Sequence, residues 1–196
     1  MSFKIEMDVS METERLLLRR FVPDDWQELF EYLSQESICK YQPYDAITEE
    51  AAMNEATYRS RDHYWAVCLK GNEKLIGDVY FRTWKYGVWE IGYVINEKYQ
   101  KNGFATEAVE ALIDDAFKYK GAHRIEARCD PRNTASWKIL ERLGFRREGH
   151  LLQDTCFKCD EKNLPIWTDT FIYGILATEW RKEIGVDFTK TTVNIH

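Results

Sequence analysis

The stretch Trp89–Phe117 constrains the fold more than any other part of this chain, because it joins a strand pattern to a helix pattern through a short turn. Trp89–Asn96 is mostly apolar and rich in β-branched and aromatic residues, which is typical of a buried strand. From Thr106 onward, apolar residues recur at helical spacing, opposite a face that carries acids such as Glu107 and Asp114. That pattern predicts an amphipathic helix, and the whole run predicts an α/β domain.

The turn between this strand and this helix predicts a phosphate site. Backbone N–H groups at the start of a helix have no intrahelical partner, and the helix dipole adds partial positive charge there. A phosphate ester fits such a position. Gly103 and Ala105 allow close approach, because one lacks a Cβ atom and the other has a minimal side chain. On the residues alone, a tight Asn-Gly turn before a helix explains this stretch equally well.

The turn also carries a family resemblance. Its Gln-x-x-Gly-x-Ala motif, built from Gln100, Gly103 and Ala105 after an Ile-Gly-Tyr-Val-Ile strand, resembles the acetyl-coenzyme A motif of the GCN5-related N-acetyltransferase (GNAT) superfamily. The flanking residues and the opening Thr13–Arg19 resemble its RimJ/RimL-like branch, which acetylates protein N-termini, including ribosomal ones. The resemblance implies a single-domain α/β fold. In it a mixed, mostly antiparallel sheet splays at its central strand and carries helices on both faces.

The same resemblance implies where acetyl-coenzyme A would bind as a substrate. Backbone groups of Val94, Ile95 and Asn96 would pair with the pantetheine arm. The pyrophosphate would lie on the turn formed by Gln100, Lys101, Asn102, Gly103, Phe104, Ala105 and Thr106. A second run, Asn-Thr-Ala-Ser leading to Leu-Gly-Phe, resembles another superfamily motif, in which Asn133 and Ser136 would lie near the cofactor. From the residues alone, Asn133 is equally a helix cap.

Two residues are predicted to be catalytic, Glu90 and Ser136. Glu90 is the only carboxylate inside the central strand, where an unpaired Glu is disfavoured. It is read as a general base, directly or through water, because attack on a thioester needs a neutral amine and an acceptor amine is protonated at pH 7. The alternative for Glu90 is a salt-bridged or sheet-edge residue. Leu140 stands where many superfamily members carry a Tyr that protonates the thiolate, so Ser136 is predicted as the donor, with water as the alternative.

Composition limits the partners and the location. The net charge of −6 comes without a basic block, which argues against nucleic acid or an anionic membrane as the main partner. No apolar run approaches ~18 residues and the N-terminus lacks an apolar segment, so we expect no transmembrane helix or signal peptide and a cytoplasmic protein. The five cysteines include a single Cys-x-x-Cys pair, Cys156 and Cys159, and are expected to be reduced and free of metal.

One domain over residues 12–183 is predicted, with tails at 1–11 and 184–196. The expected strands are Glu14–Phe21, Tyr64–Leu69, Lys74–Trp84, Trp89–Asn96, His123–Cys129, Phe145–Leu152 and Thr168–Trp180. Besides the central helix, helices are expected from Pro23, over Thr48–Arg61 and over Ala135–Leu143. Tyr41–Ile47 and Gln153–Trp167 are expected to be loops.

The expected reaction is acetyl transfer to a primary amine by direct attack on the thioester. The acceptor that the resemblance favours is a protein N-terminal α-amine. A small-molecule acceptor, such as a polyamine or an antibiotic, would use the same cofactor residues. A catalytically silent acetyl-coenzyme A-binding module also stays open, and so does the choice between a monomer and a homodimer.

Overall fold

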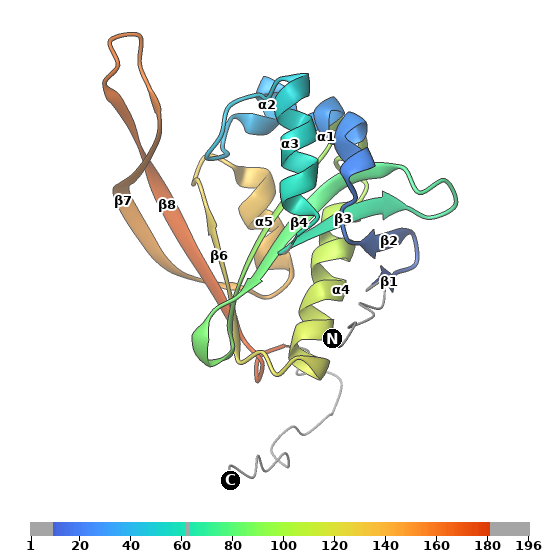
Figure 1. Cartoon of the computed structure of the whole chain (residues 1–196). Helices are drawn as coiled ribbons and strands as arrows, with labels where there is room; N and C mark the ends of the chain where they lie inside the picture. Colours follow the sequence, from blue (N-terminus) through green and yellow to red (C-terminus); the bar gives the residue numbers. More distant parts are fainter. Residues whose placement is uncertain (1–9, 62, 181–196) are drawn as a thin grey trace, which may run out of the picture.

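The strand and helix patterns assemble into a mixed sheet with helices on both faces (Figure 1). The computed structural model describes residues 10–61 and 63–180. Their strands are β1 (Met11–Glu12), β2 (Leu16–Arg19), β3 (Tyr64–Leu69), β4 (Leu75–Thr83), β5 (Val88–Ile95), β6 (Arg124–Cys129), β7 (Arg146–Cys159) and β8 (Pro165–Leu176). The helices are α1 (Trp26–Leu33), α2 (Glu36–Cys39), α3 (Glu49–Arg59), α4 (Phe104–Tyr119) and α5 (Thr134–Arg142), with 3-10 turns η1 (Pro23–Asp25), η2 (Lys85–Gly87) and η3 (Glu97–Tyr99).

The sheet opens at its centre, as predicted. Its strand order is β1-β2-β3-β4-β5-β6-β8-β7, and within the described residues β5 and β6 form the parallel pair. A parallel pair needs a crossover, which α4 supplies. β5 pairs with β6 only over Val88–Glu90, although it continues to Ile95. The two strands therefore part from Ile91 onward, and a gap opens between them.

Two apolar layers fix this arrangement. On one face, α4 packs Val109, Leu112 and Ile113 against β5, and all three side chains are fully buried. On the other face, Leu29 and Leu33 of α1 join α3 over the same sheet. Burying one such side chain stabilises a fold by roughly 1.5–3 kcal/mol. The layers therefore pack β5 from both faces in the part without a β6 partner, through Ile91 and Ile95 on one face and Val94 on the other.

The prediction of a loop over Gln153–Trp167 is wrong. This stretch continues β7 and β8 as a long hairpin that stands away from the body (Figure 1). Thr155 and Thr168 face each other across the ladder, with their Oγ1 atoms 3.0 Å apart. Asp160 closes the turn by accepting hydrogen bonds from backbone N–H groups of the tip. Polar composition and Pro165 indicated a loop, but a Pro at the first residue of a strand is compatible with a sheet.

Smaller differences concern the element ends. α4 begins at Phe104, earlier than the expected Thr106, and the short helix α2 was not expected. Met11 pairs with Leu18, so the sheet starts inside the segment predicted as a tail. Positions 181–183 of the predicted domain and the tail 184–196 lie outside the described residues.

No helix in the described part of the chain is long and apolar enough to cross a membrane. The five cysteines are free thiols, and Cys68 is fully buried whereas Cys129 is only half-buried. Both cysteines of the Cys-x-x-Cys pair lie in β7. Over residues 10–61 and 63–180, no group of three or more His, Cys, Asp or Glu side chains is placed to hold a metal ion.

Glu31 on α1 ties this helix to the end of β5. Its carboxylate accepts hydrogen bonds from Lys74 Nζ and Lys98 Nζ, both at 2.8 Å, and from Asn96 Nδ2 at 3.2 Å. These hydrogen bonds, led by the one from Lys74, lower the pKa of Glu31 to about 2. A lowered folded-state pKa stabilises the fold above the unfolded pKa of ~4.3, and the stabilisation is lost as the pH falls toward the folded value.

We therefore expect Glu31→Gln to lose up to about 1 kcal/mol of stability at pH 7, since the side chain is partly exposed. The loss should shrink as the pH falls below ~4.3, because the wild type then loses the same interaction. Thermal unfolding midpoints at a series of pH values would measure this, with exposed Glu49→Gln as the control. Parallel curves for wild type and Glu31→Gln would contradict the prediction.

Candidate active site

The gap between β5 and β6 opens into adjoining cavities that run through the sheet. The helix cavity, about 570 Å³, lies at the start of α4. The hairpin cavity, about 420 Å³, lies against the β7–β8 hairpin. A passage of about 80 Å³ shares Tyr93, Asn133 and Ser136 with the helix cavity and Arg128 with the hairpin cavity. Two substrates can therefore approach one point from different sides.

The helix cavity collects most of the residues predicted to bind the cofactor. These are Val94, Ile95, Gln100, Lys101, Gly103, Phe104, Ala105, Thr106, Asn133 and Ser136. Asn96 and Asn102 are not in its lining. Asn96 is fully buried, where its side chain accepts from Lys98 N and donates to Glu31. Asn102 donates to the carbonyl of Gln100 at 3.0 Å. Both asparagines therefore shape the turn instead of facing the cavity.

The backbone groups of β5 that face the gap differ from the three residues expected to pair with a pantetheine arm. Asn96 N donates to the carbonyl of Ile76 in β4 at 2.8 Å. Since backbone groups alternate sides along an antiparallel strand, Val94 also faces β4. Ile95 and Tyr93 face the gap, and the Ile95 carbonyl there accepts from Gln100 Nε2 at 2.9 Å. The backbone groups open toward the gap are thus the Ile95 N–H and those of Tyr93, which the sequence analysis did not include.

The start of α4 presents an open set of donors to the helix cavity. Gly103 is the N-cap residue with φ +84°, and no side chain caps the helix. Arg15 holds this end in place, because its guanidinium donates to the Asn102 carbonyl, pairs with Glu107 and stacks over the Phe104 ring. The N–H groups of the first turn are therefore free to bind an anion.

Basic side chains surround this open helix end. Lys101 lies in the turn, and Lys138 and Arg142 project from α5 one helical turn apart. No Asp or Glu belongs to the described lining of the helix cavity. The sequence analysis missed Lys138 and Arg142, although their i, i+4 spacing was the available signal. This donor set suits a phosphate-bearing substrate.

We expect Gly103→Val to weaken acetyl-coenzyme A binding roughly ten- to a hundredfold. A left-handed φ costs a β-branched residue about 1–3 kcal/mol, and the added Cβ would lie 3.3 Å from Arg15 Nη2. The turn must move to relieve both, which displaces the N–H groups of α4, and ~1.4 kcal/mol is a tenfold change in affinity. Calorimetry would measure the affinity.

A matched control for this variant is Gly71→Val. Gly71 has φ +96° and no neighbour within 4 Å of an added Cβ, and it lies in the turn between β3 and β4. It should carry the same backbone strain and leave the affinity unchanged. Equal affinities for wild type and Gly103→Val would show that the turn does not hold the cofactor.

The passage is lined by side chains from β5 and α5. Asn133 caps α5, as its side chain accepts from Ser136 N at 3.2 Å. Tyr93 Oη donates to the Ser136 carbonyl at 2.8 Å, and Ser136 Oγ lies 3.4 Å from Tyr93 Oη. Leu140, one turn further along α5, is buried and gives the passage an apolar wall. The hydroxyl groups of Tyr93 and Ser136 thus meet where the passage joins the helix cavity.

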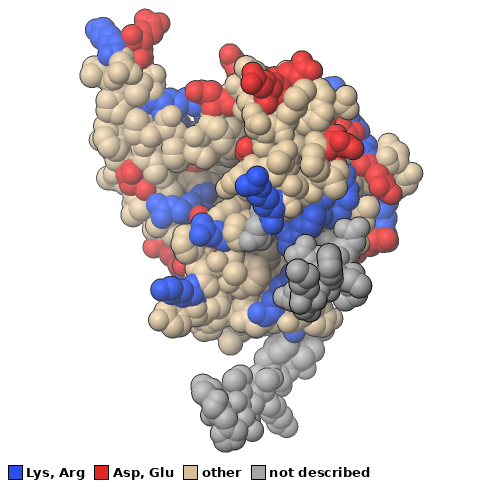
Figure 2. Space-filling model, in the orientation of Figure 1, with Lys and Arg blue, Asp and Glu red and all other residues tan. Residues whose placement is uncertain are grey.

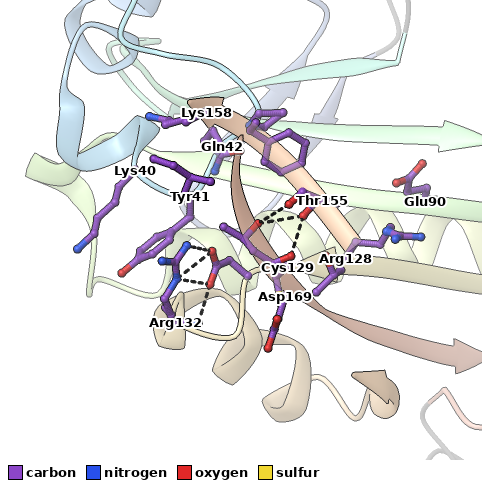
Figure 3. Close-up of a pocket in the computed structure, with 16 residues that line it drawn as sticks. Lys40, Tyr41, Gln42, Glu90, Arg128, Cys129, Arg132, Thr155, Lys158 and Asp169 are labelled. Atoms are coloured by element: carbon purple, nitrogen blue, oxygen red, sulfur yellow. Dashed lines mark hydrogen bonds and ion pairs between the residues drawn. The ribbon is translucent and has the colours of Figure 1, made fainter. Parts of the chain in front are cut away.

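Glu90 lines the hairpin cavity (Figure 3), whereas Ser136 lines the passage and the helix cavity. Its Oε2 accepts from Trp84 Nε1 at 3.3 Å. Within the described residues, no ion pair of 4.0 Å or less involves Glu90, so a salt bridge does not explain this carboxylate. The side chain is half-buried and is available to a cationic group entering the hairpin cavity.

The hairpin cavity has charged walls of both signs. Lys40, Arg128, Arg132 and Lys158 are its basic side chains, and Glu90, Asp130 and Asp169 its acidic ones. Figure 3 shows Glu90 and Lys40 at opposite ends. Figure 2 shows Lys and Arg side chains around the hollow beside the hairpin. Apolar contacts come from Tyr41, Phe157 and Ile166.

Comparisons with known proteins agree with this geometry. Residues 15–146 match the profile of the acetyltransferase (GNAT) domain family. The uncharacterized N-acetyltransferase YnaD of Bacillus subtilis (strain 168) is 38% identical over 171 residues, which cover 86% of this chain and 97% of that protein. The [ribosomal protein uS5]-alanine N-acetyltransferase of Escherichia coli (strain K12) is 27% identical, over 72% of this chain and 80% of that protein.

A solved structure shares the whole architecture. The GNAT-family acetyltransferase from Bacillus anthracis superposes with a TM-score of 0.78 at 35% identity, covering 87% of this chain and 100% of that chain. Its agreement confirms the expected α/β fold with a mixed, splayed sheet. The family match covers most of the chain. The matched residues include the start of α4, the basic side chains of the helix cavity, and the strands β5 and β6 that part at the gap. This chain belongs to the GNAT acetyltransferase family and is an N-acetyltransferase that uses acetyl-coenzyme A as its acetyl donor.

Proposed function

We propose that this enzyme acetylates the N-terminal α-amine of a protein or peptide. The observation that carries the proposal is the hairpin cavity, which is open, long and lined by charges of both signs. Of its three carboxylates, Asp130 pairs with Arg132 and Asp169 is hydrogen-bonded to His150, which leaves Glu90 for one ammonium group and disfavours a polycation such as a polyamine. A peptide brings a single ammonium group at its N-terminus, which suits Glu90, and a chain that Phe157 and Ile166 can contact. The similarity to a ribosomal-protein alanine acetyltransferase is consistent with this acceptor.

The proposed reaction uses one residue from the lining of each cavity. An ammonium group entering the hairpin cavity gives a proton to Glu90, directly or through water, and becomes a nucleophilic amine. The amine attacks the thioester carbonyl in the passage, so a C–N bond forms and the C–S bond breaks. The sulfur leaves with the electron pair as a thiolate, toward which the Ser136 hydroxyl donates a hydrogen bond. The second proton of the attacking nitrogen passes through water to that thiolate, which gives the amide and the free thiol. Positioning and electrostatic stabilisation then account for the acceleration, and no covalent enzyme intermediate is required.

The cofactor side of the proposal assigns roles to the helix cavity. The first turn of α4, with Lys101, Lys138 and Arg142, would bind the phosphate groups of acetyl-coenzyme A. The backbone of Tyr93 and the N–H of Ile95 would pair with its pantetheine arm, as an added strand pairs with a sheet edge. Asn133 would act by capping α5, which orients Ser136.

A thiol-release assay with acetyl-coenzyme A tests the acceptor. Short peptides with free N-termini would be compared with the same peptides N-acetylated, with spermidine and with an aminoglycoside. We expect release only with free N-terminal peptides, and mass spectrometry should place the acetyl group on the α-amine. Faster release with spermidine or the aminoglycoside than with every peptide would overturn the N-terminal acceptor and leave a small-molecule acetyltransferase.

Three expectations remain proposals about the protein as a whole. The domain is proposed to span residues 12–183, the protein to be cytoplasmic, and the chain to be a monomer or a homodimer. Sedimentation at micromolar concentration decides the last point, and a single monomeric species would remove the homodimer.

A further inference from the structure

The point where β5 separates from β6 leaves a structural problem at the passage. From Ile91 onward, no backbone ladder joins β5 to β6. α5, which carries Ser136, lies beyond this gap. α5 packs on β6 and β7, on the far side of the gap from β5, so a link between Ser136 and β5 has to be made by a side chain that crosses the gap.

Tyr93 crosses it. Its backbone is fixed in β5 by the ladder with β4, where it lies opposite Val79, and its ring packs against the main apolar core. Its hydroxyl donates to the Ser136 carbonyl at 2.8 Å, which is a well-formed hydrogen bond. β5 is thus linked to the first turn of α5 at Ser136, the residue proposed above to donate to the leaving sulfur.

The hydroxyl groups of Tyr93 and Ser136 each carry one hydrogen, and the two hydrogens have different roles. A phenol has one hydrogen, and in Tyr93 it is committed to the Ser136 carbonyl. The Ser136 hydroxyl donates toward Tyr93 Oη at 3.4 Å, close to the limit for a hydrogen bond. That weak contact costs little to give up, so the serine hydrogen is the one that can turn to a developing thiolate.

We propose that Tyr93 is the positioning residue for Ser136, holding its hydroxyl at the junction of the passage and the helix cavity so that it donates to the leaving sulfur. This inference rests on the proposed role of Ser136. Burial raises the pKa of the Tyr93 phenol, so the link persists throughout the neutral and mildly alkaline range. Both partners of this bond belong to the protein, so the donor is preorganised.

The test measures the pKa of the thiol of bound coenzyme A, which needs no acceptor. Thiolate formation would be followed by ultraviolet absorbance across pH, against the same protein with desulfo-coenzyme A. The enzyme's own Cys129, which lines the passage, does not interfere where a thiol of ordinary pKa, ~8.5, titrates, because burial raises the pKa of Cys129 to about 12. A hydrogen bond to the thiolate lowers the thiol pKa, so losing it should raise that pKa by about one unit.

The pKa of the bound thiol is compared among three variants and a control. Ser136→Ala and Tyr93→Phe should each raise the bound thiol pKa by about one unit, and the double variant should raise it no further. Tyr173→Phe is the matched control, because Tyr173 Oη donates to Glu141 at 2.9 Å and so holds the other end of α5. It should leave the thiol pKa unchanged even if it destabilises the helix.

The outcomes separate this inference from the assignment of Ser136. An unchanged thiol pKa in Tyr93→Phe with a raised one in Ser136→Ala would overturn the role of Tyr93 and keep that of Ser136. Additive effects in the double variant would also overturn it, because Tyr93 would then act on the sulfur by itself. An unchanged thiol pKa in Ser136→Ala would remove the serine donor and this inference with it, and acetyl transfer to an N-terminal amine would still be tested by the acceptor screen.

Discussion

Glu90→Gln is expected to lower kcat for acetyl transfer about 10²–10⁴-fold at pH 7, the range lost when a positioned general base is removed. Glu90 lies in the hairpin cavity, accepts a hydrogen bond from Trp84 and makes no ion pair with a described residue. The amide of Gln keeps the size of the side chain and can still accept from Trp84, so the change removes chiefly the base. Turnover should recover partly at high pH, where an α-amine with a pKa near ~8 is already neutral.

Glu126→Gln is the matched control for this variant. Glu126 lies directly opposite Glu90 in the β5–β6 register, but its carboxylate accepts from Arg124 and it does not line the hairpin cavity. Its turnover and pH profile should resemble those of the wild type. Should Glu90→Gln keep wild-type turnover and pH profile, the amine would lose its proton by another route and Glu90 would be structural.

Asp78→Asn is expected to destabilise the fold by about 3–5 kcal/mol, the cost of removing one partner of a buried ion pair, because it leaves Arg59 with the longer, 3.4 Å contact to Glu55. Arg59 belongs to α3, its side chain is 1% exposed, and its Nη1 lies 2.8 Å from Asp78 Oδ2 in β4. Tyr32 of α1 donates to the same carboxylate at 2.7 Å. The pair thus connects two helices and the sheet in the layer opposite α4, and a neutral amide cannot compensate the guanidinium.

Urea unfolding measures this loss, with midpoint and slope compared between wild type and variant. The double variant Asp78→Leu with Arg59→Met should regain part of the stability, because it removes both charges and fills the site with apolar groups. A loss below about 1 kcal/mol in Asp78→Asn would show that water or another group compensates Arg59, since that is the range of an exposed pair.

The turn before α4 was predictable because it is local. Within Trp89–Phe117, a strand pattern, a glycine and a helix pattern follow one another. Together they predict a helix start with unpaired N–H groups, and this prediction does not depend on the rest of the fold. The structure accordingly places Gln100, Gly103 and Ala105 in the lining of one cavity. The helix boundary differed only slightly, since α4 begins at Phe104.

The hairpin shows where local patterns misled the prediction. Gln153–Trp167 is polar and contains Pro165, which indicated a loop, yet it forms the ladder between β7 and β8. Polar residues are compatible with a strand that stands away from the core, because neither face has to be buried. The acceptor side of the site therefore has ordered walls that composition alone did not predict.

The sequence by itself determined the family, the crossover between parallel strands and the uncapped helix start after a glycine turn, because each depends on residues that are close in the chain. The tertiary structure decided which backbone groups of β5 face the gap. These groups alternate between the two edges of the strand, and only the pairing with β4 shows which of them point away from β4. It also decided that Lys138 and Arg142 join the turn, that Tyr93 meets Ser136, and that Glu90 lines the adjoining hairpin cavity. Those contacts join strands and helices distant in sequence, and only the packing of α4 and α5 against an opened sheet brings them together.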